Sequence, residues 1–292
     1  MSSSHTAPVA YADGLMGELD ATERAYLAVL ETSAIERYDP VPGVIGLPPW
    51  AWAASEAPLE AARMRLLAQV RDFRPRFQLL FRYPTPEVAQ RHTDAFELLE
   101  GWLVRAGGDL SAPGSIDSAV VQLRAAVQVL RDSRRLLPAD VLAVRVVADT
   151  NALIDCPDLT AYAGQLGKRY RVHLLPVVLG ELDDLKRSGR TPEMREAARS
   201  AVRRLKALRQ SGDVRSGVRV AGDISAVFEH VEPRGEKLPG WLDLNVPDDR
   251  LVASALLLQS AHPGSAVFVA TGDLNLQTKL TAVRLPFVEL PD

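Results

Sequence analysis

Residues 144–149 constrain the fold of this chain more than any other stretch. Residues 144–148 read Val-Arg-Val-Val-Ala, a short and mostly apolar run that is rich in β-branched side chains. Such a run is typical of a buried strand in a parallel sheet, where both faces of the strand are covered. Asp149 follows directly. Open α/β sheets bind ligands at the carboxyl ends of their strands, so we expect Asp149 to lie at a functional site.

After Pro138 the sequence alternates between strand patterns and helix patterns. We predict strands at 144–149, 172–175, 218–221, 224–230, 266–270 and 287–290. We predict helices at 159–169, 177–188 and 192–210, a helix that opens at 247–249 and ends near 261, and a helix at 274–282. Alternation of this kind indicates a parallel sheet flanked by helices. Residues 141–292 are therefore predicted to form one α/β domain.

The first half of the chain has helical periodicity instead. Helices are predicted at about 20–38, 55–82, 85–106 and 115–136, with a possible break at Pro75 and an irregular proline-rich loop at 39–49. We expect residues 1–18 to be a flexible N-terminus and residues 19–140 to be an all-α domain. No constellation of reactive residues stands out there, so a packing module is the expected role. That module would bind a protein partner or a second copy of the chain.

Composition limits the class of protein. The net charge is −3 and hydrophobic residues make up 47% of the chain, which is enough for a sizeable core. Cys156 is the single cysteine, so an intrachain disulfide and a thiolate metal cluster are both excluded. The first residues lack a signal-peptide pattern, and no apolar run approaches the roughly 18–20 residues of a membrane span. We therefore expect a cytoplasmic protein without membrane association.

Three more acids stand at places comparable to Asp149, namely Glu181, Asp249 and Asp273. Taken singly, the aspartates would be interpreted as helix N-caps and Glu181 as a solvated helix residue. Taken together they indicate a site, because Asp149 and Asp273 each end an apolar strand and parallel strands end at one edge. Carboxylates gathered there repel each other unless cations neutralise them. Divalent ions such as Mg²⁺ prefer oxygen ligands, and a pair of them can support phosphodiester cleavage.

Four motifs carrying these acids resemble those of the PIN domain family. Residues 149–155 resemble its first motif, 177–183 its second, 247–253 its third and 270–276 its fourth, in family order. The resemblance implies a PIN-like fold and a metal-dependent nuclease that usually cleaves RNA, with Mg²⁺ or Mn²⁺ as cofactor. It implies Asp149, Glu181, Asp249 and Asp273 as the catalytic and metal-binding acids. It also suggests supporting polar roles for Asn151, Thr271 and Asn275.

The third motif offers two adjacent acids. If the helix begins at Asp249, Asp248 is its natural N-cap and Asp249 lies in the first turn, where the helix dipole also favours a carboxylate. Neighbours on a helix point about 100° apart, so the two acids cannot both face the strand edge. We therefore predict that Asp249, rather than Asp248, binds metal.

Basic residues balance these acids. Residues 186–209 hold nine Lys and Arg against two Glu. Arg195, Arg199 and Arg203 recur every four residues and share a helix face. This face is either an ordinary solvated surface or a phosphate-binding flank, because Lys and Arg supply sequence-independent affinity for nucleic acid. The candidate nucleic-acid-binding residues are Lys186, Arg187, Arg195, Arg199, Arg203 and Lys206. Trp241 either anchors its loop or stacks on a base.

Three alternatives to an endoribonuclease remain open at this level. One is a PIN-fold module that binds RNA or a protein without cutting it. Another is a structure-specific DNA nuclease. The third is a phosphotransferase or phosphatase with Asp149 as nucleophile. That chemistry usually needs a second acid two residues later, where Asn151 stands.

Overall fold

A computed structural model describes residues 8–37, 50–105, 112–230, 232–235 and 238–290 of the chain. The chain divides into two compact units. The helical unit is Ala12–Leu137, and the α/β unit is Pro138–Asp292 together with the residues up to Tyr11.

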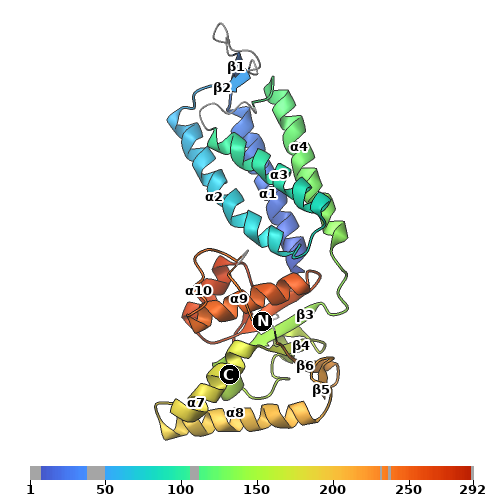
Figure 1. Cartoon of the computed structure of the whole chain (residues 1–292), viewed down its shortest axis with the longest axis vertical. Helices are drawn as coiled ribbons and strands as arrows, with labels where there is room; N and C mark the ends of the chain where they lie inside the picture. Colours follow the sequence, from blue (N-terminus) through green and yellow to red (C-terminus); the bar gives the residue numbers. More distant parts are fainter. Residues whose placement is uncertain (1–7, 38–49, 106–111, 231, 236–237, 291–292) are drawn as a thin grey trace, which may run out of the picture. The chain divides into compact units, whose positions relative to one another are not determined.

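The helical unit is built from four long helices that lie side by side (Figure 1). They are α1 (Tyr11–Glu31), α2 (Ala57–Leu79), α3 (Pro86–Val104) and α4 (Ile116–Ser133), with a 3₁₀ turn η1 (Arg134–Leu136) after α4. Phe73, Phe77 and Phe96 are almost fully buried and pack against one another in its core. Helix α4 begins where Ser115 accepts a hydrogen bond from the Ser118 N–H. Helices therefore dominate this half, as the sequence predicts.

Three details of the helical unit differ from the expectation. Helix α1 begins at Tyr11, so residues 11–18 are its first two turns and not part of a flexible N-terminus; residues 1–7 lie outside the described part. Strands β1 (Ile35–Arg37) and β2 (Trp50–Trp52) pair antiparallel, so the unit is not purely helical. Pro75 lies inside α2 without ending it, because Phe73 and Phe77 hold that stretch in the core.

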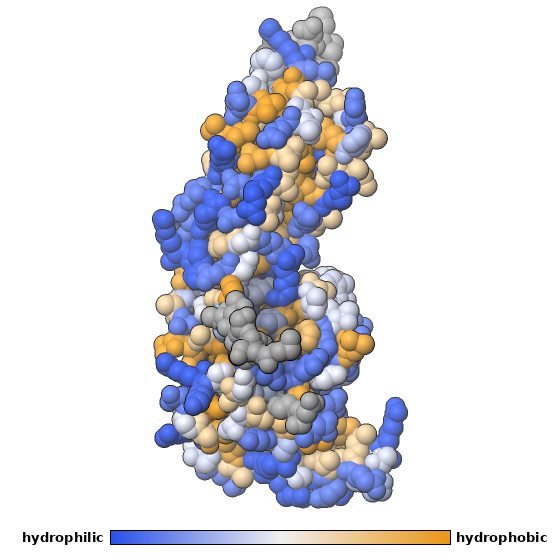
Figure 2. Space-filling view, turned by 180° about the vertical axis from the view of Figure 1, so that it is seen from behind, coloured by the Kyte–Doolittle hydropathy of each residue, from blue (hydrophilic) through white to orange (hydrophobic). Residues whose placement is uncertain are grey.

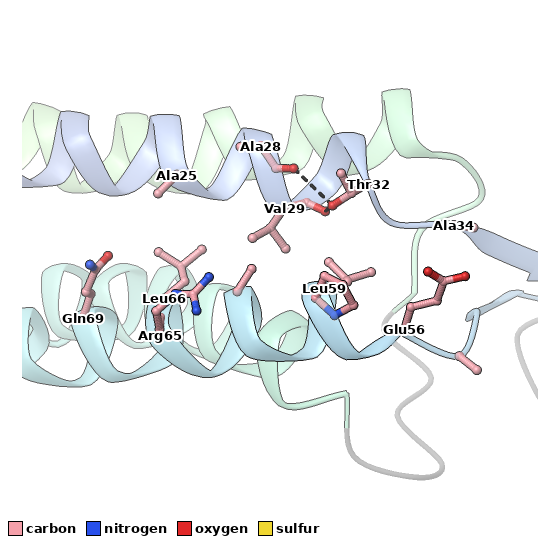
Figure 3. A pocket seen from close by; sticks show the side chains of 13 residues that line it. Ala25, Ala28, Val29, Thr32, Ala34, Glu56, Leu59, Arg65, Leu66 and Gln69 are labelled. Carbon is pink, nitrogen blue, oxygen red and sulfur yellow. Dashed lines mark hydrogen bonds between the residues drawn. The ribbon is translucent and has the colours of Figure 1, made fainter.

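A groove of about 750 Å³ runs between α1 and α2 (Figure 3). Small and apolar side chains line most of it, including Ala25, Ala28 and Leu66, with Glu56 and Arg65 as charged members. Hydrophobic residues are also visible between hydrophilic ones on the surface of the helical unit (Figure 2). The expected role of this unit in binding a partner or a second copy stays a prediction.

The α/β unit holds a six-stranded sheet in the order β5-β6-β4-β3-β7-β8. The strands are β3 (Val144–Ala148), β4 (Arg171–Leu174), β5 (Val218–Ala221), β6 (Ile224–Phe228), β7 (Ala266–Ala270) and β8 (Phe287–Val288). All neighbours are parallel except β5, which pairs antiparallel with β6. Every residue of β3 is buried, as its apolar sequence predicts. The mixed α/β class with a mostly parallel sheet is confirmed.

The helices of this unit are α5 (Thr150–Asp155), α6 (Ala163–Leu166), α7 (Pro176–Ser188), α8 (Pro192–Gln210), α9 (Pro247–Ala261) and α10 (Leu274–Ala282). The predicted helix at 159–169 is wrong: only the single turn α6 forms there, and Gly167 ends it at a φ of +87°. The short helix α5 begins after Asp149, which is its N-cap, as the interpretation of Asp149 as a helix N-cap implies. The chain runs from β3 to β4 on one side and returns through β7 on the other. Strand β3 is thus the point where the connections diverge, and its carboxyl end is the expected ligand position.

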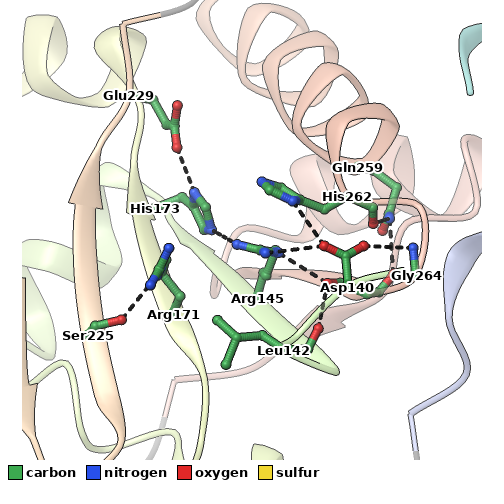
Figure 4. Close-up of polar contacts among 11 residues, drawn as sticks. Asp140, Leu142, Arg145, Arg171, His173, Ser225, Glu229, Gln259, His262 and Gly264 are labelled. Carbon is green, nitrogen blue, oxygen red and sulfur yellow. Dashed lines mark hydrogen bonds and ion pairs between the residues drawn. The ribbon is translucent and has the colours of Figure 1, made fainter. Parts of the chain in front are cut away.

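A buried polar network lies beside the central strands (Figure 4). Arg145 of β3 contacts His173 Nε2 at 3.2 Å and Asp140 Oδ1 at 3.3 Å, and His173 Nδ1 lies 2.8 Å from Glu229 Oε1. Burial lowers the pKa of His173 to about 4, so the ring is neutral near pH 7. Because Arg145 can only donate, His173 accepts at Nε2 and donates from Nδ1 to Glu229. This network is structural, as expected for His173.

No helix in the described residues combines the length and the apolar character that crossing a membrane requires.

Candidate active site

A pocket of about 320 Å³ opens where the carboxyl ends of β3 and β7 meet the first turns of the helices that follow. Its carboxylates come from separate elements of the chain. Its lining includes Asp149, Glu181, Asp184, Asp248 and Asp273. Three of the four predicted acids, Asp149, Glu181 and Asp273, therefore line one pocket. The fourth, Asp249, does not line it, whereas its neighbour Asp248 does.

Asp149 follows β3 and caps α5. Its Oδ1 accepts the Ala152 N–H at 2.5 Å, and its own N–H donates to the Ala270 carbonyl of β7 at 3.1 Å. The residue is only 5% exposed. Burial raises the pKa of Asp149, while hydrogen bonds from Thr271 and Ala152 lower it and the charge of Asp273 raises it again. The cap and the site function are therefore combined in one side chain.

Glu181 lies in α7, the helix that follows β4. The Thr150 hydroxyl donates to its Oε2. Burial raises the pKa of Glu181, and the charges of Asp248 and Asp149 add to that rise. Like charges near a carboxylate disfavour its ionised form, which is why Asp248 and Asp149 act in this direction.

Asp273 caps α10, where its Oδ1 accepts the N–H groups of Asn275 at 2.7 Å and Leu276 at 3.1 Å. The two predicted supporting residues connect the acids. Thr271 is hydrogen-bonded through its side chain to Asp149 and accepts the Asp273 N–H at 3.0 Å. Asn275 donates from Nδ2 to Asp248 Oδ2 at 3.0 Å. Asn151, the third supporting residue, is exposed and lines the pocket.

Asp249 does not line the pocket. Its Oδ2 accepts the Asp243 N–H at 2.9 Å, and its Oδ1 lies 2.8 Å from Lys279 Nζ. Burial raises the pKa of Asp249, but the bonds from Lys279 and Asp243 outweigh it and hold the pKa below its usual value. The expected helix start is wrong: α9 begins at Pro247 with Val246 as N-cap, so Asp248 is not the cap. Metal binding by Asp249 stays a prediction.

Two further charged residues at the site are not predicted by the sequence analysis. Asp184 lines the pocket beside Glu181, and their i, i+3 spacing on α7 is the signal that could have found it. Lys279 of α10 contacts both Asp248 and Asp249 although it follows them by about 30 positions. No local sequence pattern predicts a contact between residues so far apart along the chain.

The basic residues after Glu181 are spread over α7 and α8, which pack against each other. Lys186 pairs with Asp183 and Arg187 with Asp184 on α7, while Arg199 and Arg203 both pair with Glu196 on α8. Arg195 instead donates to the Gly189 carbonyl at 2.6 Å and holds the α7–α8 turn. A Cβ at Gly189 would meet the Leu185 carbonyl oxygen at 2.6 Å, so this turn requires glycine.

Arg199, Arg203 and Lys206 are exposed and remain candidates for phosphate contacts. Trp241 precedes α9 and is 49% exposed, which leaves its ring accessible to a base. Base stacking by Trp241 stays a prediction.

The donor set fits a hard divalent cation, because it consists of carboxylate oxygens around one pocket. The side chains are not grouped as ligands in their present positions: within the described residues, no three His, Cys, Asp or Glu side chains are arranged to hold a metal ion. The recorded contacts occupy one oxygen each of Glu181, Asp248 and Asp273.

Comparison with known proteins agrees with the geometry. Residues 146–289 match the sequence model of the PIN domain family. A search of curated protein sequences finds no match. The matched range runs from the middle of β3 through β8 and contains every acid of the pocket. The C-terminal half of this chain is therefore a PIN domain.

Proposed function

We propose that the α/β unit is an endoribonuclease that depends on Mg²⁺ or Mn²⁺. PIN domains are generally nucleases. The observation that carries the proposal is the convergence of Asp149, Glu181, Asp248 and Asp273 on one pocket at the strand ends. Each comes from a different helix or strand end, so local sequence preference alone does not explain their meeting.

Asp149, Glu181, Asp248 and Asp273 would hold the cation, and Asp184 lines the same pocket. When bound, such an ion lowers the pKa of water and stabilises the oxygen that leaves phosphorus. The chain supplies the rest. Thr150 orients Glu181, Thr271 connects Asp149 to the Asp273 backbone, and Asn275 connects Asp273 to Asp248. These polar residues fix the carboxylates before substrate arrives.

RNA is the proposed substrate because the resemblance to PIN domains implies RNA cleavage, and candidate residues for phosphate contacts lie beside the acids. Lys186 and Arg187 lie in the last turns of α7, whose Asp184, Leu185 and Ser188 line the pocket. The exposed Arg199, Arg203 and Lys206 of α8 would extend this contact along a strand of nucleic acid.

A cleavage panel tests the proposal. Single-stranded RNA, structured RNA and DNA of matched sequence are incubated with the full chain in Mn²⁺, Mg²⁺ or EDTA, beside Asp149→Asn as control. We expect metal-dependent cleavage of RNA that the variant loses. Preferential cleavage of DNA would change the substrate class. Binding of RNA without cleavage in either metal would favour a non-catalytic PIN module.

A further inference from the structure

Lys279 places a positive charge at the edge of the carboxylate pocket. It lies in α10, and its side chain is 19% exposed. Its Nζ is 2.8 Å from Asp249 Oδ1 and 3.3 Å from Asp248 Oδ2. One ammonium group therefore bridges two neighbouring acids, of which only Asp248 faces the pocket.

The bridge has a fixed geometry. The backbone N–H of Asp243 holds Asp249 from the other side at 2.9 Å, and Asn275 holds the same Asp248 oxygen at 3.0 Å. The Lys279 ammonium is thus a unit positive charge whose position is set by both acids.

A permanent cation at this place has two electrostatic consequences. It offsets the repulsion among the clustered carboxylates while no metal is bound, which favours the folded protein. It also opposes a divalent ion that approaches the same Asp248, because like charges a few ångströms apart repel strongly in a partly buried site.

We propose that Lys279 is an internal counter-cation that holds Asp248 and Asp249 in position before metal binds, and that thereby limits the affinity of the pocket for a divalent ion. This inference rests on the proposed function, since it assigns a role toward the ion of that same site. Lys279 acts through Asp248 and is a positioning residue.

The test compares Lys279→Met, which removes the charge and keeps the aliphatic length, with Lys279→Arg, which keeps the charge. Lys168→Met is the matched control, because Lys168 is exposed and lies outside the pocket. Mn²⁺ affinity is measured by titration calorimetry, and melting is followed with EDTA and with saturating Mn²⁺. Neither readout depends on catalysis.

We expect Lys279→Met to bind Mn²⁺ roughly tenfold more tightly, as the loss of a unit charge a few ångströms away implies. Its melting temperature in EDTA should fall, and Mn²⁺ should raise it by more than in the wild type, because a ligand of higher affinity stabilises more. Lys279→Arg and Lys168→Met should resemble the wild type. Equal or weaker Mn²⁺ binding by Lys279→Met would overturn the inference.

Two other results of this experiment are interpreted separately. If the wild type binds no Mn²⁺, the proposed function fails. If Lys279→Met does not fold, the double variant Asp249→Asn with Lys279→Met removes both partners of the closer ion pair and is compared with Asp249→Asn alone. Tighter Mn²⁺ binding by the double variant supports a counter-cation, and equal binding overturns it.

Discussion

At the scale of single residues, Asp149 has two roles: it caps a helix, and it lines the carboxylate pocket. It caps α5 through Ala152, and its burial beside Asp273 raises its pKa. The folded protein therefore binds a proton at Asp149 more tightly than the unfolded chain does. It follows that the ionised side chain reduces the stability of the metal-free protein as the pH rises through the folded pKa.

The first prediction concerns Asp149→Asn. Cleavage should fall by ~100-fold or more, because several kcal/mol of transition-state stabilisation depend on the metal site. Asn can still accept the Ala152 N–H, so the metal-free melting temperature near pH 7.5 should stay equal or rise. That gain should shrink as the pH falls, because Asp149 then takes up a proton and loses the charge that burial disfavours. Calorimetry in EDTA at pH 7.5 and at acidic pH decides this. A clear drop in melting temperature at pH 7.5 would contradict it.

The second prediction separates the two adjacent acids of α9. Asp248 lines the pocket, whereas Asp249 is engaged by Lys279 and Asp243. Asp248→Asn should therefore lower cleavage about tenfold or more with little change in melting. Asp249→Asn should lower the melting temperature more than Asp248→Asn does and spare more activity. If only Asp249→Asn abolishes cleavage, the assignment made from the sequence is restored.

At the scale of elements, the α7–α8 pair combines a structural turn with a candidate binding face. Arg195 belongs to the turn, since it holds the Gly189 carbonyl. Arg199 and Arg203 belong to the exposed face and share Glu196. Charge reversal at Arg195 would therefore disturb the turn, and it is a poor probe of nucleic-acid binding.

The third prediction uses the exposed face alone. The double variant Arg199→Glu and Arg203→Glu should weaken RNA binding and reduce the slope of log affinity against log salt by up to about 2, one for each lost phosphate contact. The matched control is Arg91→Glu with Arg124→Glu, two exposed arginines of the helical unit. Filter binding at several salt concentrations gives the slopes. Identical slopes for both double variants would exclude this face of α8.

At the scale of the whole molecule, the main segment of the α/β unit runs from Pro138 to Asp292, three residues more than the predicted domain 141–292. Asp140 lies in those three residues. It pairs with the buried Arg145 and accepts the Gly264 N–H at 2.8 Å. Removing one partner of a buried ion pair leaves an uncompensated charge, which costs about 3 kcal/mol or more.

The fourth prediction follows for two fragments. Residues 138–292 should fold and retain metal-dependent cleavage. Residues 141–292 should melt at a lower temperature, because Arg145 loses Asp140. Full-length Asp140→Ala should lose stability in the same direction, which separates the ion pair from the truncation itself. Equal melting of the two fragments would show that Arg145 finds another partner.

The sequence alone determined the parts of this protein that depend on local pattern. The apolar runs at β3 and β7 are buried strands because both of their faces are covered, and the acids after them lie together because parallel strands end at one edge. The strands β1 and β2 were not predictable, because each has three residues and their pairing joins segments separated along the chain. The predicted helix at 159–169 was wrong because glycine ends its single turn.

Only the tertiary structure decided which acid of the Asp248–Asp249 pair faces the pocket. A helix turns by about 100° per residue, so the side chains of two neighbouring residues point in different directions. The contacts of Asp249 with Asp243 and Lys279 hold its carboxylate away from the pocket that Asp248 lines. Those contacts depend on a loop and on a distant helix, and the local sequence around Asp248 contains neither.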